Sequence, residues 1–264
     1  MKKVLMLICM LSTGSLCWAQ ATAPSLGSAA KFAVLGSSTV TNGGPTVITG
    51  NLGVAPGTSI TGFPPGTVNG AIDAGDLVAL VAQANATKAY AALKAETCMT
   101  PLTGQDLGGM TLSPGVYCFT SSAQLTGQLT LNGNGVYVFQ IGSTLTTAAS
   151  SSVVLTNGAL CGNVFWQVGS SATLGATNAF VGSILALASD TVGASTSIAG
   201  RVIALTAAVT LDTDNITVTG CSGGGGGGGH HKHCCANEDD DCDNQDGNNQ
   251  DGNHQDGNHQ EQDD

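Results

Sequence analysis

The sequence predicts a mostly β protein, a solenoid of coils of about 18 residues with one long α-helix packed alongside. Three observations lead to this prediction. Short β-branched runs such as "VVLTNG" and "LTLNGNG" are interrupted by Gly, Asn or Pro, which is typical of short strands joined by turns. The pattern also returns at a fixed period, and a single segment has the spacing of a helix.

The repeat has a period of eighteen residues. This shift superposes two sets of apolar residues: Trp166, Ile184 and Val202, and Phe180, Ile198 and Ile216. The period is too short for a propeller blade or a helical repeat, and it suits one coil of a β-helix with three short strands. Because a single coil cannot bury its apolar side, stacked coils share a continuous core. We therefore expect both sets to stack inside the solenoid.

The helix is expected at residues 73–97, a stretch rich in helix-forming residues with no proline after its start. Its apolar stripe, with spacings of three and four, consists of Val78, Ala82, Ala86, Ala89 and Leu93. Asp73 and Asp76 suit the start of a helix, and Lys88 and Lys94 suit its later turns. A narrow, alanine-rich face of this kind should lie flat against a β surface.

Two outward columns of hydroxyl side chains follow from the register, because side chains alternate along a strand that turns Leu174 inward. An upstream unit matches at a shift of twenty-seven residues, which places Thr146 on Thr173. The first column therefore contains Thr146, Thr173 and Thr191 and is then followed by Val209. The second contains Ser150, Thr177, Ser195 and Thr213. Small Gly175 and Gly193 lie between the columns, and Asp190 is expected near the edge. The result is a flat lattice of hydroxyls and methyls, better suited to binding something ordered than to catalysis.

The two ends of the chain are predicted to be separate from this domain. Residues 1–19 have the basic start, apolar centre and cleavage site of a signal peptide, so we expect a secreted protein, with a periplasmic location left open. The domain spans 20–222, a glycine linker spans 223–229, and an acidic, disordered tail spans 230–264. The tail holds eleven of the eighteen acidic residues, so the net charge of −11 describes mainly the tail.

The cysteines of residues 20–222 predict two disulfides in an exported protein. Cys98, Cys118, Cys161 and Cys221 allow three pairings. The preferred pairing joins Cys98 to Cys118, closing a short loop, and Cys161 to Cys221, tying back the last strand.

Several classes of function are disfavoured. All five histidines lie in the tail, which excludes a histidine-based triad or metal site in the domain. The weak metal-ligand candidates of the tail are His230, His231, His233, Cys234 and Cys235, and we expect no functional metal there, and no cofactor. Asp212 and Asp214 are candidate acids for polysaccharide cleavage, but the favoured interpretation is a turn cap before Asn215. We expect no enzyme, no nucleic-acid partner, no membrane span and a monomer.

The chain closely resembles the microbial ice-binding (antifreeze) protein family over about residues 26–220. The resemblance rests on stretches that include "KFAVLGSSTVTN", "GNLGVAPGTSITGFPPG", "LTGQDLGGMTLSPGVYCF", "GVYVFQIGSTLTTAASSSVVL" and "CGNVFWQVGSSATLGATNAFVGSILA". It implies a discontinuous right-handed β-helix with the long helix alongside. It also implies that the early segment closes the β-helix beside later coils.

The resemblance further implies binding to ice planes through one flat face, without a cofactor. We therefore expect a secreted, non-enzymatic protein that inhibits ice growth or recrystallisation. Its ice-binding residues are expected in the two hydroxyl columns, and the imperfect first column predicts moderate activity. The alternative is a surface or adhesion module that binds polysaccharide or matrix.

Overall fold

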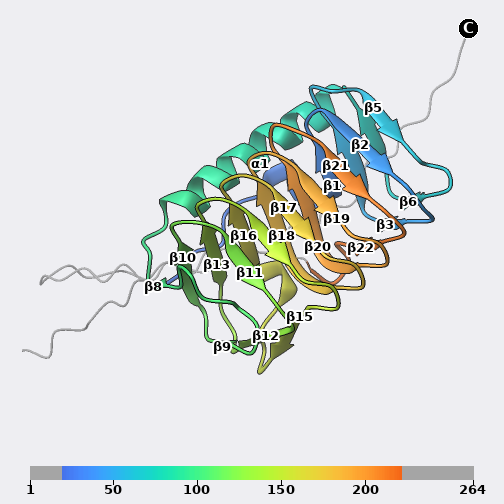
Figure 1. Cartoon of the computed structure of the whole chain (residues 1–264). Coiled ribbons are helices and arrows are strands. Elements are labelled where there is room, and N and C mark those ends of the chain that lie inside the picture. Colours follow the sequence, from blue (N-terminus) through green and yellow to red (C-terminus); the bar gives the residue numbers. More distant parts are fainter. Residues whose placement is uncertain (1–19, 222–264) are drawn as a thin grey trace, which may run out of the picture. The chain divides into compact units, whose positions relative to one another are not determined.

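The computed structural model describes residues 20–221, which form a mostly β structure with one long helix and two parallel sheets. The predicted signal peptide, glycine linker and acidic tail, with its metal-ligand candidates, lie outside these residues. Figure 1 shows the strands stacked in rows beside helix α1. Among the described residues, no helix combines the length and apolar character that crossing a membrane requires.

The smaller sheet has seven parallel strands in the order β11, β14, β17, β19, β21, β2, β5. Their bounds are β2 Thr39–Asn42, β5 Ser59–Thr61, β11 Ala123–Leu125, β14 Leu145–Thr147, β17 Ala172–Leu174, β19 Asp190–Val192 and β21 Val209–Leu211. The strands follow chain order except at one point, where the last strand, β21, lies beside the early strand β2 and Val209 pairs with Val40. The predicted closure of the early segment beside later strands is therefore confirmed (Figure 1).

The larger sheet has fifteen parallel strands, of which β6, β3, β22, β20, β18, β16, β13, β10 and β8 follow one another. The bounds in this sheet are β1 Phe32–Gly36, β3 Val47–Thr49, β4 Asn51–Val54, β6 Thr67–Asn69, β7 Ile72–Ala74, β8 Thr100–Pro101, β9 Thr111–Leu112, β10 Gly115–Phe119, β12 Gln128–Asn132, β13 Tyr137–Ile141, β15 Ser152–Thr156, β16 Val164–Val168, β18 Ala179–Ala186, β20 Ser197–Ala204 and β22 Asn215–Thr217. Here too early strands lie beside late ones, because β1 pairs with β20 and β3 pairs with β22.

The helix α1 spans Leu77–Ala95, and Asp76 caps it by accepting a hydrogen bond from the backbone N–H of Ala79 at 2.9 Å. Of the predicted apolar stripe, Ala82, Ala86, Ala89 and Leu93 are buried. The prediction for Val78 is wrong: it is 53% exposed and Ala79 is buried instead. The helix also begins later than predicted, because Asp73 lies in β7 rather than in the first turn. Two short 3-10 helices complete the elements, η1 Gly27–Lys31 and η2 Cys161–Asn163.

The core has two parts. One lies between the sheets, where the two predicted apolar stacks pair in register and are buried. Its aromatic rings also stack, with the ring centroids of Phe139 and Trp166 4.0 Å apart. The other part lies between the larger sheet and α1. Both preferred disulfides are present, Cys98 with Cys118 and Cys161 with Cys221.

Candidate functional site

The outer face of the smaller sheet carries a row of threonines, one from each of six neighbouring strands. In β14, β17, β19 and β21 the middle residue is exposed and its two neighbours are buried. We call this set the threonine row; in sheet order it consists of Thr146, Thr173, Thr191, Thr210, Thr41 and Thr61. Because paired strands lie about 4.7–4.9 Å apart, the row offers a hydroxyl and a methyl at each step.

Thr146, Thr173 and Thr191 share this row as predicted, but the prediction that Val209 follows them is wrong. Val209 is buried and pairs with Asp190, and Thr210 pairs with Thr191. The connection that leads into β21 is one residue longer than in the repeat before, and the connection that follows is one residue shorter. A fixed shift of eighteen residues cannot detect two changes that cancel.

Glycines beside the row let the backbone of neighbouring turns pack closely. A Cβ on Gly175 would lie 2.7 Å from the backbone of Ala148 and Ala149. A Cβ on Gly193 would lie 2.7 Å from the backbone N of Ala176. Since real Cβ atoms do not come this close to backbone, a larger residue would push neighbouring levels apart. The predicted place of both glycines between the hydroxyl columns is confirmed.

The second predicted set lies beyond the strand ends rather than within the strands. We call it the corner column; it consists of Ser150, Thr177, Ser195 and Thr213, in the turns that lead from the smaller to the larger sheet. All four side chains are exposed, and their φ angles are 59°, 59°, 61° and 59°. The Oγ of Ser150 lies 2.9 Å from the Oγ1 of Thr177. The left-handed backbone is unusual for any residue but glycine, and most costly for a β-branched one.

Beneath the corner column runs a buried polar set, of which the sequence indicates only Asp214, as a turn cap. We call it the inner ladder; it consists of Ser151, Asn178, Thr196, Asp214 and Thr46, and each residue is at most 3% exposed. The backbone N–H of each member donates to the side-chain oxygen of the next. The distances in this order are 2.6 Å to Asn178 Oδ1, 3.3 Å to Thr196 Oγ1, 3.0 Å to Asp214 Oδ1 and 3.0 Å to Thr46 Oγ1. Each corner is thereby bonded to the one beside it.

Asp190 does not lie near the edge of the face, as predicted, but inside the core. It is 1% exposed, and its register partners are Ala172 and Val209. Neither carboxyl oxygen has a hydrogen-bond partner among residues 20–221. Burial holds the pKa of Asp190 well above its ordinary value, because an apolar surrounding disfavours the charged form. The strand alternation that turns Thr191 outward turns its neighbour inward.

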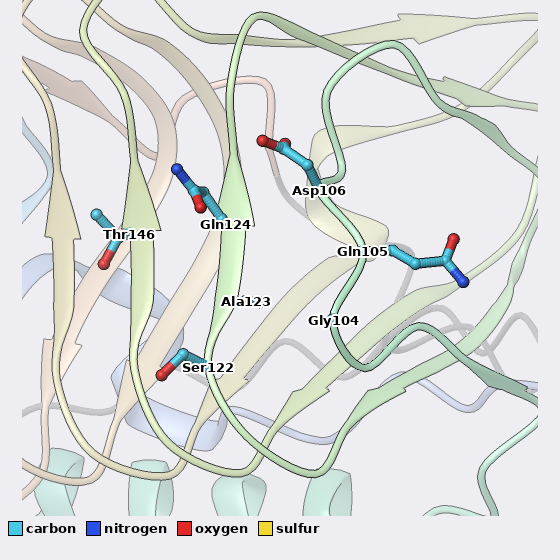
Figure 2. A pocket seen from close by; sticks show the side chains of 7 residues that line it. All are labelled: Gly104, Gln105, Asp106, Ser122, Ala123, Gln124 and Thr146. Atoms are coloured by element: carbon cyan, nitrogen blue, oxygen red, sulfur yellow. The ribbon is translucent and has the colours of Figure 1, made fainter.

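The face ends beside β11. Gln124 pairs with Thr146 and replaces threonine at the next step of the row. Beyond it, the loop that contains Gln105 and Asp106 borders a hollow of about 390 Å³. Figure 2 shows the Asp106 carboxylate turned toward β11 and the Gln105 side chain turned away from it. Burial would raise the pKa of Asp106, but hydrogen bonds from the N–H groups of Gly108 and Thr126, each 2.8 Å long, hold it below the ordinary value.

Most charges of the described residues lie away from the threonine row. Lys31 belongs to η1, and Lys88 and Lys94 belong to α1. Arg201 is buried and donates two hydrogen bonds to the carbonyl oxygen of Ala30, at 3.1 and 2.8 Å. The six strands of the threonine row therefore expose no charged side chain. Within residues 20–221, no three His, Cys, Asp or Glu side chains gather as metal ligands.

The two candidate acids hold turns. Asp214 accepts hydrogen bonds from the backbone N–H groups of Thr196 and Asp212, at 3.0 and 2.8 Å, so the predicted turn cap is confirmed for this residue. Burial raises the pKa of Asp214 to about 6, although these bonds favour its charged form. Asp212 is exposed and accepts a bond from the Thr213 hydroxyl at 3.0 Å.

One sequence signal could have identified the missed ladder residues. Each ladder residue of the later repeats directly follows a corner residue, in the pairs "SS", "TN", "ST" and "TD". A small polar residue directly after each corner residue therefore indicates a buried member of the inner ladder. Thr41 and Thr61 have no comparable signal, because they come from the early segment and join the row only through strand pairing.

These features define a class of protein: a mostly β molecule that presents one flat, uncharged row of regularly spaced hydroxyls and methyls. Residues 34–217 match the family described as Ice-binding-like, and the chain belongs to this family. An ice-binding protein of Nostoc sp. (strain HG1) is 54% identical over 197 residues, which cover 73% of each chain. An ice-binding protein of Colwellia sp. is 34% identical over 235 residues, or 81% of this chain and 92% of that one.

Solved structures of ice-binding proteins also resemble this chain in fold. An ice-binding protein from an Antarctic biological consortium superposes with a TM-score of 0.73 at 41% identity, covering 80% of this chain and 96% of the other. One from the Antarctic ascomycete Antarctomyces psychrotrophicus has a TM-score of 0.73 at 42% identity, covering 75% and 98%.

Proposed function

We propose that this protein is a non-enzymatic ice-binding protein that adsorbs to ice through the outer face of its smaller sheet. The ice-contacting residues are the threonine row and the corner column. On this proposal the chain is a discontinuous right-handed β-helix, secreted as a monomer, that restrains ice growth or recrystallisation outside the cell. Relatives named as ice-binding proteins and the family membership support the activity.

The observation that carries the choice of face is the threonine row itself. Six threonines from six neighbouring strands stand in register with no charge among them. Each hydroxyl can bond to a surface water, and each adjacent methyl leaves a gap that an ordered water layer can fill. Parallel hydrogen bonds on both sides of each inner strand keep the row rigid, so little conformational entropy is lost on docking.

The experiment compares tyrosine substitutions on and off this face. Thr173→Tyr and Thr191→Tyr place a bulky ring at the centre of the row and should weaken the inhibition of ice recrystallisation. Thr87→Tyr is the matched control, because Thr87 is exposed on α1. The proposal fails if the wild-type protein neither shapes nor restrains ice crystals. Glycan binding that survives the row substitutions would support the adhesion module instead.

A further inference from the structure

We propose that the inner ladder positions the corner column for ice contact. The buried side chains of the ladder set the geometry of the exposed corner hydroxyls but do not themselves contact ice. The inference rests on the proposed function and adds to it a set of positioning residues. The ladder residues are buried and cannot reach the ice surface, so they act through the corner column. Backbone conformation, bonding pattern and the end of the column each support this role.

The first support is the backbone of the corner column. All four residues adopt the left-handed conformation, with φ between 59° and 61°. Glycine or asparagine would adopt it at less cost, yet two of the four positions hold β-branched threonine. Strained positions persist only where the surroundings determine them, and they gather at functional sites. The presence of Ser or Thr at all four strained positions therefore indicates that their hydroxyl groups have a function.

The second support is the identity of the groups that hold each corner. The N–H of Asn178, which directly follows Thr177, donates to Thr196 Oγ1 at 3.3 Å. The same hydroxyl donates to the carbonyl of Gly175 at 3.0 Å, just before that corner. The buried Thr196 side chain thus forms hydrogen bonds with the backbone before and after Thr177. The Thr177 side chain is exposed, and its hydroxyl donates to the carbonyl oxygen of Ala176 at 2.7 Å and lies 2.9 Å from the Oγ of Ser150.

One of these two bonds, the one to the N–H that follows the corner residue, recurs along the column. Asn178 Oδ1 accepts from the N–H that follows Ser150, and Asp214 Oδ1 accepts from the N–H that follows Ser195. Thr46 Oγ1 accepts from the N–H that follows Thr213. Because an equivalent bond follows each corner residue, the four corners share one backbone conformation, with φ between 59° and 61°. A regular column is what contact with a crystal plane requires.

The third support is the end of the column beside β2. Gly44 lies against the Thr213 hydroxyl, and a Cβ there would collide with Thr213 Oγ1. Thr46, two residues further, supplies the last ladder oxygen and bonds to Asn42 Oδ1 at 2.6 Å. The early segment thus both leaves room for the Thr213 hydroxyl and bonds the turn behind it.

The test replaces Thr196 with two residues of similar size. Thr196→Val removes the hydroxyl while keeping the shape, and Thr196→Ser keeps the hydroxyl. In the full chain, Thr196→Val should lose most of the recrystallisation inhibition, and Thr196→Ser should recover it. Leu185→Ala is the control for stability alone, because Leu185 is buried between the larger sheet and α1, away from the face. It should unfold at a lower temperature and keep its activity on ice.

All variants are assayed just below 0 °C, after circular dichroism shows that they are folded at that temperature. Full activity of folded Thr196→Val would overturn the positioning role, as would an equal loss in Leu185→Ala. Should Thr196→Val not fold, Thr46→Val against Thr46→Ser asks the same question at the Thr213 corner. Failure of the proposed function looks different, because the wild type and every variant would then lack ice activity.

Discussion

Thr191 and Thr210 stand opposite each other on β19 and β21, although nineteen positions separate them and the strand pairs on either side in the chain are eighteen positions apart. This pairing carries the threonine row across to the early strands, because Thr210 in turn pairs with Thr41. The two ends of the domain therefore share one surface.

The first prediction concerns this shared surface. Thr210→Tyr and Thr41→Tyr should each reduce recrystallisation inhibition as strongly as Thr191→Tyr, by about tenfold or more in the protein concentration required. A ring standing above the row holds the remaining threonines away from the crystal. Ice assays of the three variants beside Thr87→Tyr provide the measurement. Normal activity of Thr210→Tyr with a weakened Thr191→Tyr would restrict the face to the middle strands.

The second prediction lengthens the row. Gln124 is exposed and pairs with Thr146, so Gln124→Thr adds a hydroxyl and a methyl at the next step. We expect a gain in activity of well under tenfold, equivalent to less than about 1.4 kcal/mol of binding free energy. Gln128→Thr, in β12 of the larger sheet, is the matched control. An unchanged or lower activity of Gln124→Thr would show that the hollow beside Asp106 already ends the contact at Thr146.

The third prediction concerns the buried Asp190. In the unfolded chain its pKa is about 3.9, and in the folded protein it is well above that value. Between these two pKa values the folded state binds more protons, so its stabilisation falls as pH rises, by at most about 1.4 kcal/mol per pH unit. Asp190→Val should therefore raise the free energy of unfolding at pH 7 by about 1–3 kcal/mol, since Val209 and Ala172 are its neighbours.

Urea unfolding at pH 3.5 and pH 7 measures this effect. The advantage of Asp190→Val should be smaller at pH 3.5, where the carboxyl is neutral in the folded state and mostly neutral in the unfolded state. An advantage that is equal at the two pH values would contradict an ionisable group buried without a partner. Ala172→Val, on the neighbouring strand, controls for added volume in the same stack.

The fourth prediction compares the two disulfides. The Cys161 to Cys221 bridge spans 60 residues and the Cys98 to Cys118 bridge spans 20. By loop-closure entropy, replacing the first pair with alanine should cost about 4 kcal/mol and replacing the second about 3 kcal/mol. Thermal or urea unfolding of the two double variants provides the comparison. The reverse order would show that local packing outweighs the entropy of the unfolded chain.

The class of fold, the helix and the disulfides could be predicted because their signals are local or periodic. The spacing of Ala82, Ala86, Ala89 and Leu93 identifies the buried face of α1 without reference to its partner. Val78 follows the same spacing and is nevertheless exposed. It lies in the first turn, where the end of β7 and the Asp76 cap decide where the helix begins.

The sequence by itself determined that the later repeats stack and that Thr146, Thr173 and Thr191 share one row. Internal sequence matches at shifts of eighteen and twenty-seven residues, together with strand alternation, require no knowledge of distant contacts. Only the tertiary structure decided that Thr210, Thr41 and Thr61 complete the row. The physical reason is that hydrogen bonding between parallel strands tolerates a longer connection offset by a shorter one, and pairs strands far apart in the chain. The same pairing aligned the buried oxygens beneath the corners, whereas strand alternation within β19 turned Asp190 inward.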